Sequence, residues 1–185
     1  HVTPSAWNSE EYVTTNILGT LNVLAFANRN GLRVIHISTD KVVNAKSIMG
    51  ATKNVAEIAV KNAGQVSVRF GNVLGSRGSV LSIWQRQIEK GESLTVTDAN
   101  MLRYMMSIPE AVSLIIKAAE IGEPGQILIL DMGEPVNVLN LAMEILGKSG
   151  KDVGIKIIGI RPGETLTETL MSDEEVARAI KKDNF

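Results

Sequence analysis

The sequence lacks cysteine altogether and contains only two histidines, His1 and His36. Without cysteine there is no disulfide framework and no thiolate metal site. The two histidines fall on separate predicted elements, so we expect no metal centre. The formal net charge of −1 gives no reason to expect nucleic acid or an anionic membrane as a partner.

Two longer patterns are missing as well. No apolar run approaches the roughly 18 residues that a membrane span needs, and no signal peptide is visible. We therefore expect a cytoplasmic location without membrane insertion of this segment. No G-x-G-x-x-G turn, which binds the pyrophosphate in dinucleotide-binding folds, occurs in the 185 residues, and the chain does not begin with Met.

What the sequence does contain is an alternation of helical and strand-like segments. The strand–helix–strand series between residues 33 and 70 predicts a crossover unit of an α/β fold with a parallel sheet. Ser79 and Asn137 are predicted helix caps. Apolar spacing and turn residues predict helices over 8–30, 50–62, 80–90, 109–121, 137–146 and 172–182, and strands over 33–38, 65–70, 94–97, 126–131 and 155–160.

The most reactive stretch follows the strand at 33–38. A hydroxyl, a carboxylate and an amine stand in a row at Thr39, Asp40 and Lys41. A second amine, Lys53, lies in the next helix, four residues after Met49 and on the same side of it. Ligands of open α/β sheets sit at the carboxyl ends of the strands. The cluster therefore predicts proton-transfer chemistry.

These residues carry a family resemblance. The spacing of Thr39, Met49 and Lys53 resembles the Ser/Thr…Tyr-x-x-x-Lys signature of the extended short-chain dehydrogenase/reductases. Ser-Thr-Asp-Lys followed by Gly-Ala-Thr-Lys is similar to the CapD-like nucleotide-sugar 4,6-dehydratases of polysaccharide biosynthesis. Residues 69–79 and 159–164 match that family too, and the resemblance runs from His1 to about residue 175. Met49 replaces the usual catalytic Tyr, as in the membrane-linked capsule and O-antigen branch.

The resemblance implies the C-terminal part of a Rossmann-like, doubly wound parallel sheet with an interleaved, smaller substrate-binding subdomain. Residues 1–79 would be the second half of the NAD(P)-binding domain. Residues 80–185 would be mainly the substrate-binding part, with 109–146 partly returning to the Rossmann core. Because the Gly-rich first half is missing, we interpret the chain as a fragment, or one processed piece, of a longer protein that could be membrane-anchored. The fragment alone is expected to be inactive.

The same comparison predicts how the chain assembles. The strand at 33–38 would normally pair with a strand that precedes His1, so it would be an exposed edge. We expect another chain or a displaced segment to cover it, although the edge could also stay open. In the superfamily the helices at 8–30 and 50–62 often form a dimer interface, so a homo-oligomer is expected.

The implied reaction is the NAD- or NADP-dependent 4,6-dehydration of a UDP-N-acetylhexosamine such as UDP-GlcNAc. By resemblance, Lys41 would be the base at C5, Asp40 the acid that protonates the leaving C6 hydroxyl, and Thr39 the hydrogen-bond partner of the C4 oxygen. Lys53 would bind the nicotinamide ribose. A thioether cannot take the C4 hydroxyl proton, so Asp40 or a water must replace Met49 in that step.

Further contacts follow from the matching motifs. In the strand-like stretch 103–108, Arg suits a diphosphate because its planar fork donates to two oxygens. Each assignment has a structural alternative: a plain loop at 71–79, a surface Arg103, or an Arg161–Glu164 pair. The implied cofactor contacts are Lys53, Phe70, Gly71, Asn72 and Val73, and the implied substrate contacts are Asn72, Ser79, Arg103, Arg161 and Glu164.

Two polar residues are expected to have structural rather than catalytic roles. His36 lies within the strand and is expected to be a core or near-surface histidine rather than a catalytic one. Asn16 lies within the first helix and is expected to tie that helix to its neighbouring strand.

Three other functions stay open. The chain could belong to a nucleotide-sugar epimerase of the same superfamily, including a 4,6-dehydratase that also inverts C5, although the Asp40–Lys41 pair favours dehydration. It could be a nucleotide-sugar-binding fragment without catalysis. It could also be a scaffold in which Met49 marks lost activity.

Overall fold

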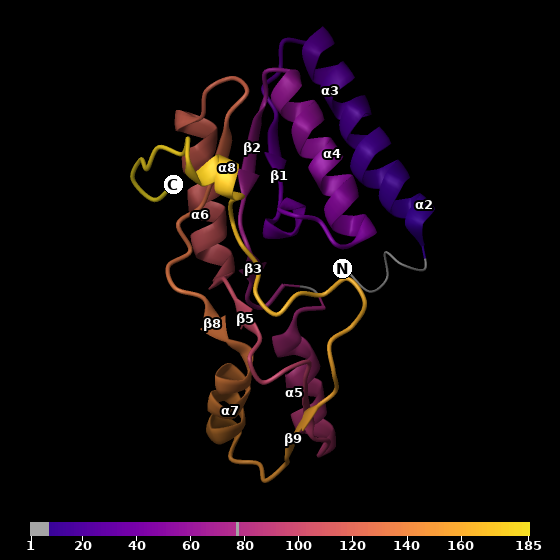
Figure 1. The fold of residues 1–185 in the computed structure, drawn as a ribbon, viewed down its shortest axis with the longest axis vertical. Coiled ribbons are helices and arrows are strands. Elements are labelled where there is room, and N and C mark those ends of the chain that lie inside the picture. The colour runs from indigo at the N-terminus through magenta and orange to yellow at the C-terminus, as the bar shows by residue number, and fades with distance from the viewer. Residues whose placement is uncertain (1–7, 77) are drawn as a thin grey trace. The chain divides into compact units, whose positions relative to one another are not determined.

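The computed structural model describes residues 8–76 and 78–185 (Figure 1). The chain forms two compact units. The first comprises the residues up to Phe70 together with 112–131 and 169–185, and the second comprises 71–111 and 132–168. The predicted boundary lay at residue 79, with 109–146 partly returning. The assignment of these parts to cofactor and substrate stays a prediction.

The first unit contains a three-stranded parallel sheet with the order β1-β2-β7. The strands are β1 (Ile35–Ile37), β2 (Val66–Arg69) and β7 (Ile127–Ile129). This confirms the predicted α/β class with parallel strands. Within the described residues β1 pairs on one side only, so the strand expected to lie at an edge does so.

Helices pack against this sheet. The predicted helix at 8–30 runs from Ser9 to Arg29 as α2 (Ser9–Tyr12), the π-helical η1 (Val13–Gly19) and α3 (Thr20–Arg29). It packs against α4 (Ile48–Asn62), which also contacts β2. Figure 1 draws α3 and α4 on one side of β1 and β2, and α6 (Ile108–Ile121) on the other.

The C-terminal helix is much shorter than predicted. α8 spans only Asp173–Val176, where Ser172 and Glu175 form a reciprocal capping box. The prediction of a helix to residue 182 is therefore wrong. The following residues carry few apolar side chains that a longer helix could bury, and the backbones of Lys182 and Phe185 bond to each other instead.

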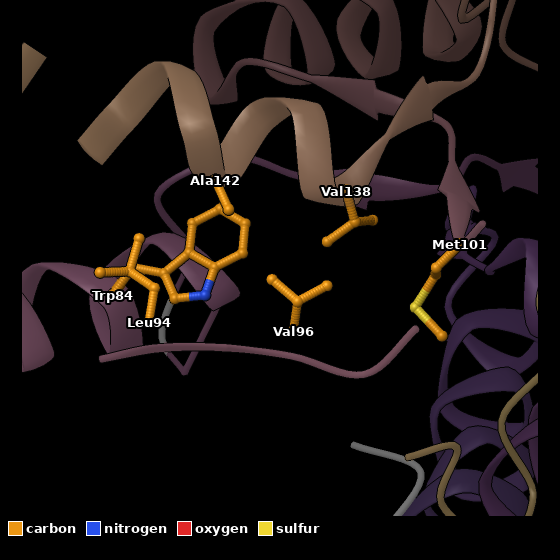
Figure 2. Packing of buried hydrophobic residues seen from close by; sticks show 6 residues of the cluster. All are labelled: Trp84, Leu94, Val96, Met101, Val138 and Ala142. Atoms are coloured by element: carbon orange, nitrogen blue, oxygen red, sulfur yellow. The ribbon is translucent and has the colours of Figure 1, made fainter. Parts of the chain in front are cut away.

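The second unit has its own apolar core (Figure 2), built around the fully buried Trp84. The indole Nε1 donates to the carbonyl of Thr95 at 2.8 Å, so its polar atom is satisfied inside the core. Figure 2 labels the cluster, which consists of Trp84, Leu94, Val96, Met101, Val138 and Ala142.

The described residues of this unit form two helices and six short strands. The helices are α5 (Val80–Lys90) and α7 (Val138–Ser149). The parallel pairs are β3 (Asn72–Val73) with β6 (Met105–Met106), and β4 (Leu94–Val96) with β9 (Ile155–Ile157). The antiparallel pair is β5 (Leu102–Arg103) with β8 (Val136–Asn137).

Three local expectations need comment. The predicted strand at 103–108 is interrupted at Tyr104, because β5 and β6 pair with different partners. Asn137 caps α7 as predicted, accepting a hydrogen bond from the Asn140 backbone. Ser79 precedes α5 as predicted, but its hydroxyl pairs with the Ser82 hydroxyl at 3.1 Å instead of with a backbone N–H.

Candidate active site

The turn after β1 gathers three predicted site residues around one oxygen atom. Thr39 precedes a 3₁₀ turn, η2 (Asp40–Val42), and its side chain accepts a hydrogen bond from the Lys41 backbone. The Thr39 hydroxyl donates to Asp40 Oδ1 at 3.0 Å, and Lys41 Nζ donates to the same oxygen at 2.8 Å. The structure therefore places the hydroxyl, the carboxylate and the amine in direct contact.

Asp40 is fully buried, yet only one of its carboxylate oxygens is satisfied. Within the described residues Oδ2 has no hydrogen-bond partner, and the hydroxyl of Ser38 is likewise buried and unpaired. Buried polar atoms without a partner are rare in folded proteins, and each calls for an explanation. A buried acceptor at the carboxyl end of a parallel strand is suited to a ligand group or an ordered water.

Helix α4 brings the next two predicted residues to this turn. Ser47 caps the helix by accepting from the Gly50 backbone at 3.1 Å, so the helix begins two residues earlier than predicted and Met49 lies in its first turn. A Cβ at Gly50 would lie 2.2 Å from the Lys41 carbonyl oxygen. Only glycine therefore allows the helix to approach η2 this closely. Lys53 lies one turn beyond Met49.

The Lys53 amine points back toward strand β1. Its Nζ donates to the Ile37 carbonyl and lies 3.1 Å from His36 Nε2, so its bonds go to the strand and not to Asp40. Burial lowers the pKa of Lys53, and the Glu57 carboxylate offsets part of that change. Burial and the neighbouring Lys53 charge lower the pKa of His36 to about 4.

Asn16 also supports α4, although not in the predicted way. Its side-chain amide donates to the Thr52 hydroxyl at 2.9 Å, and Thr52 in turn donates to the Ile48 carbonyl. The expected tie to a neighbouring strand is therefore a tie to helix α4. The contact comes from the π-helical stretch η1, and such local widening of a helix is frequent at functional sites.

The segment that follows β2 begins in the first unit and continues into the second. Phe70 is buried, and its carbonyl accepts from the Asp40 backbone at 3.0 Å. In the second unit the Gly71 backbone donates to Met132 Sδ at 2.8 Å, and Asn72 and Val73 form strand β3. The predicted loop at 71–79 thus starts as a short paired strand.

Arg103 is engaged within the second unit. It is buried, and its guanidinium donates to the carbonyls of Leu102, Thr165 and Leu166 at 2.7, 2.7 and 3.0 Å. Arg103 is therefore buried and not a surface residue. It holds the chain segment that follows the Arg-Pro-Gly-Glu turn, and a phosphate contact stays a prediction.

The Arg-Pro-Gly-Glu turn closes on itself. The Glu164 backbone donates to the Arg161 carbonyl at 3.0 Å, and the Glu164 carboxylate accepts from the Arg161 backbone at 3.2 Å. Gly163 has a φ of 82°, which other residues rarely adopt. The carboxylate thus stabilises the turn through the Arg161 backbone.

Known proteins resemble this chain in sequence. Residues 1–185 match a family described as polysaccharide biosynthesis proteins. The chain belongs to this family. It is 48% identical over 186 residues to the probable polysaccharide biosynthesis protein EpsC of Bacillus subtilis, and 44% identical over 187 residues to the capsular polysaccharide biosynthesis protein CapD of Staphylococcus aureus. Each match covers 95% of this chain and 31% of the relative, so the chain spans about a third of their length.

Solved structures confirm the Rossmann-like fold. Pen from Bacillus thuringiensis has a TM-score of 0.92 at 35% identity, over 98% of this chain and 60% of that one. DesIV, a dTDP-glucose 4,6-dehydratase from Streptomyces venezuelae solved with NAD, has a TM-score of 0.83 at 19% identity, over 96% of this chain and 63% of that one, and shows the fold alone. UDP-glucose 4-epimerases of Rickettsia species are also relatives, at 36–37% identity over 91% of this chain and 52% of theirs.

One buried cluster in the first unit, centred on Arg69, was not predicted from the sequence motifs. Arg69, 3% exposed, binds Glu57, Glu175 and the Leu170 carbonyl. Partial burial opposes ionisation of Glu175, but hydrogen bonds from Arg69 and from the Ser172 backbone outweigh it and lower the pKa of Glu175. This cluster fastens the segment around α8 to β2 and α4. An apolar strand that ends in Arg was the available signal.

Two features are absent from the residues that the structure describes. No helix among them is both long and apolar enough to cross a bilayer. No group of three or more His, Asp or Glu side chains among them could hold a metal ion.

Proposed function

We propose that this chain is the catalytic part of a nucleotide-sugar 4,6-dehydratase that acts on a UDP-N-acetylhexosamine with NAD or NADP. The observation that supports it is the contact of Thr39, Asp40 and Lys41 at the carboxyl end of β1. Simple epimerisation needs no such additional acid and base. Dehydration needs both, because a C5 proton and the C6 hydroxyl must leave.

The cofactor suits the residues that the structure provides. When bound, it takes a hydride from C4 of the sugar and later returns it to C6. Dinucleotides lie at the carboxyl ends of the strands in Rossmann-like folds. There the Lys53 amine lies beside the Ile37 carbonyl, and the Phe70 carbonyl after β2 accepts from the Asp40 backbone. Lys53 would bind the ribose, and the segment from Phe70 to Val73 would lie near the nicotinamide.

The proton steps balance on the chain's own residues. Asp40 takes the C4 hydroxyl proton as the sugar is oxidised, which replaces the Tyr that is Met49 here. Lys41, as the neutral amine, removes the C5 proton while Asp40 gives its proton to the leaving C6 hydroxyl, so water departs. Lys41 returns its proton to C5 when the hydride reaches C6. Thr39 orients the carboxylate throughout.

The contact between Lys41 and Asp40 makes this exchange physically reasonable. The proposed reaction starts from the Asp40 carboxylate beside the neutral Lys41 amine, which is one proton fewer than the ion pair, and the 2.8 Å hydrogen bond keeps the two groups in contact. The unpaired Oδ2 of Asp40 leaves an acceptor for the substrate while Oδ1 holds its two neighbours. Positioned acid–base groups of this kind typically contribute about 10²–10⁴-fold to a rate.

The test compares variants of the complete enzyme with UDP-GlcNAc and cofactor, following the product by NMR. We expect Lys41→Ala and Asp40→Asn to abolish formation of the 4-keto-6-deoxy sugar. Lys46→Ala, in the same loop but exposed, should retain activity. Near-normal turnover by Lys41→Ala would refute the base assignment.

Epimerisation is the second candidate, since epimerases are among the relatives. The same NMR experiment separates the two reactions, because a C4 epimer keeps its C6 hydroxyl whereas the dehydration product does not. Calorimetry that shows nucleotide-sugar binding without cofactor binding would instead support a binding module.

The proposal includes a homo-oligomer. The helix from Ser9 to Arg29 and helix α4 both expose apolar side chains, with Phe26 63% exposed. Such clustered exposure is costly in water and suits a helix-to-helix contact with a second copy. The other exposed apolar side chains of these two helices are Val13, Leu18, Leu21, Val23, Val55 and Ile58.

A further inference from the structure

His36 occupies an unusual position for a histidine. It lies in β1 of a parallel sheet, where buried apolar residues are typical, and it is only 9% exposed. Its strand partner across the sheet is Ser67, which is fully buried as well. Both side chains belong to the layer between the sheet and helix α4, because His36 contacts Lys53 of that helix.

The two ring nitrogens have defined partners. Nε2 lies 3.1 Å from Lys53 Nζ, and Nδ1 lies 3.2 Å from the Ser67 hydroxyl. A lysine ammonium has donors and no acceptor, so Nε2 must accept and the ring proton must be on Nδ1. That N–H then donates to the Ser67 oxygen. The contacts therefore fix one neutral tautomer of His36.

Lys53 is held from two directions. One N–H points to His36 Nε2 and a second to the Ile37 carbonyl. The ammonium has three N–H bonds, so one is left to bind a ligand at the carboxyl end of the strand. A lysine side chain otherwise has many rotamers, and ordering it costs conformational entropy whenever a ligand binds.

The charged groups around His36 favour its neutral form. Lys53 and Glu57 face it from α4, and Arg69 follows Ser67 on the same face of β2. Glu57 is bound by Arg69, so it does not reach the imidazole as a counter-ion. Protonated His36 would place two cations 3.1 Å apart. The imidazole is therefore a hydrogen-bond acceptor near neutral pH.

We propose that His36 is a positioning residue for Lys53: its Nε2 and the Ile37 carbonyl orient the ammonium so that the remaining N–H meets the ribose hydroxyls of the dinucleotide. Ser67 holds the imidazole ring in place. The inference rests on the proposed function, because it takes Lys53 to be the cofactor-binding amine. From the sequence, His36 was expected to be a core or near-surface histidine without a role in the site.

The first experiment needs no activity and no cofactor. The imidazole resonances of the protein are followed by NMR against pH and assigned by their loss in His36→Gln. We expect His36 to carry its proton on Nδ1 and to titrate well below 6.5. Lys53→Met should shift that titration upward, whereas Lys61→Met, an exposed lysine on the same helix, should not. If His36 titrated near 6.5 and its titration were unchanged in Lys53→Met, the contact between His36 and Lys53 would be refuted.

The second experiment measures cofactor and nucleotide-sugar binding by calorimetry in the complete enzyme. His36→Leu should weaken NAD(P) binding by roughly tenfold, and a comparable rise in the KM for the cofactor should exceed the change in kcat. The entropy cost of ordering a free lysine side chain on binding corresponds to roughly ten- to thirtyfold in affinity, which sets the scale. Nucleotide-sugar affinity should stay unchanged, and His36→Gln should recover most of the loss because its amide oxygen can accept from Lys53.

The outcomes separate the two hypotheses. Unchanged cofactor affinity in His36→Leu would overturn the positioning role while leaving the dehydratase proposal intact. If the unaltered enzyme bound no NAD(P), the proposed function would fail, and the NMR titration would still decide whether His36 holds Lys53. An equal loss of cofactor affinity in His36→Leu and His36→Gln would refute the role of the acceptor nitrogen, because His36 would then act only through packing.

Discussion

Gly50 links the stability of the first unit to the geometry of the candidate site, so Gly50→Ala is the most informative single substitution. A Cβ at this position would lie 2.2 Å from the Lys41 carbonyl oxygen, 3.2 Å from the Lys41 carbonyl carbon and 3.3 Å from Ala45 Cβ. Contacts of a real Cβ stay beyond 3.0 Å. The helix or the η2 turn must therefore retreat by at least about 0.8 Å.

Two opposing effects set the magnitude. Alanine within a helix is favoured over glycine by about 1 kcal/mol. Overpacking against backbone atoms costs about 1–3 kcal/mol, so we expect a net loss of roughly 0–2 kcal/mol in the free energy of unfolding. The effect on activity should be larger, because displacing the Lys41 carbonyl also moves the Asp40–Lys41 pair. A shift near 1 Å predicts a loss of up to about 10²-fold in kcat.

Denaturant unfolding and turnover of the complete enzyme measure the two quantities separately. Gly147→Ala is the matched control. Gly147 is an exposed residue of α7 with nothing within 4 Å of its Cβ position, so this substitution should raise stability by roughly 0.5–1 kcal/mol without changing turnover. If Gly50→Ala were as stable and as active as Gly147→Ala, the close contact between α4 and η2 would be refuted.

Three further predictions concern the rest of the first unit. Arg69→Met should lower the free energy of unfolding by about 3–5 kcal/mol in denaturant titrations at neutral pH, because it leaves Glu57 buried without its partner. The folded pKa of Glu175 lies below its ordinary value of 4.5. The stabilisation by its contact with Arg69 is therefore complete above pH 4.5 and is lost as the pH falls through the folded pKa. The acid limb of the stability curve should flatten in Arg69→Met, and an unchanged acid limb would contradict this. Phe26→Glu should lower the oligomer mass in sedimentation measurements whereas Ile180→Glu, 89% exposed elsewhere, should not, and an unaltered mass in both variants would contradict the proposed interface.

The prediction of the fold succeeded where local patterns coincide with tertiary contacts. Strands β1 and β2 and helix α4 were recognisable because short apolar runs alternate with a helix of 3.6 periodicity and end at Gly64 and other turn residues. β3 and β8 were missed, since strands of two residues have no pattern of their own. They exist only because distant segments offer backbone partners.

The same division applies to the candidate site. Thr39, Asp40 and Lys41 are consecutive, so a turn at the end of a strand was enough to bring them together, and this grouping was predictable. The direction of the Arg103 guanidinium was not. It depends on carbonyls of Thr165 and Leu166, which lie more than 60 residues further along the chain.

The sequence by itself determined the α/β class, the family and the Thr39–Lys41 cluster, because period, motif and adjacency are properties of a linear chain. Only the tertiary structure decided that His36 meets Lys53, and that Arg69 meets Glu57 and Glu175. These pairs are separated by 17, 12 and 106 residues. They form because α4 and the segment around α8 pack on chosen faces of the strands. A burial pattern can predict that packing takes place, but not which polar atoms it brings into contact.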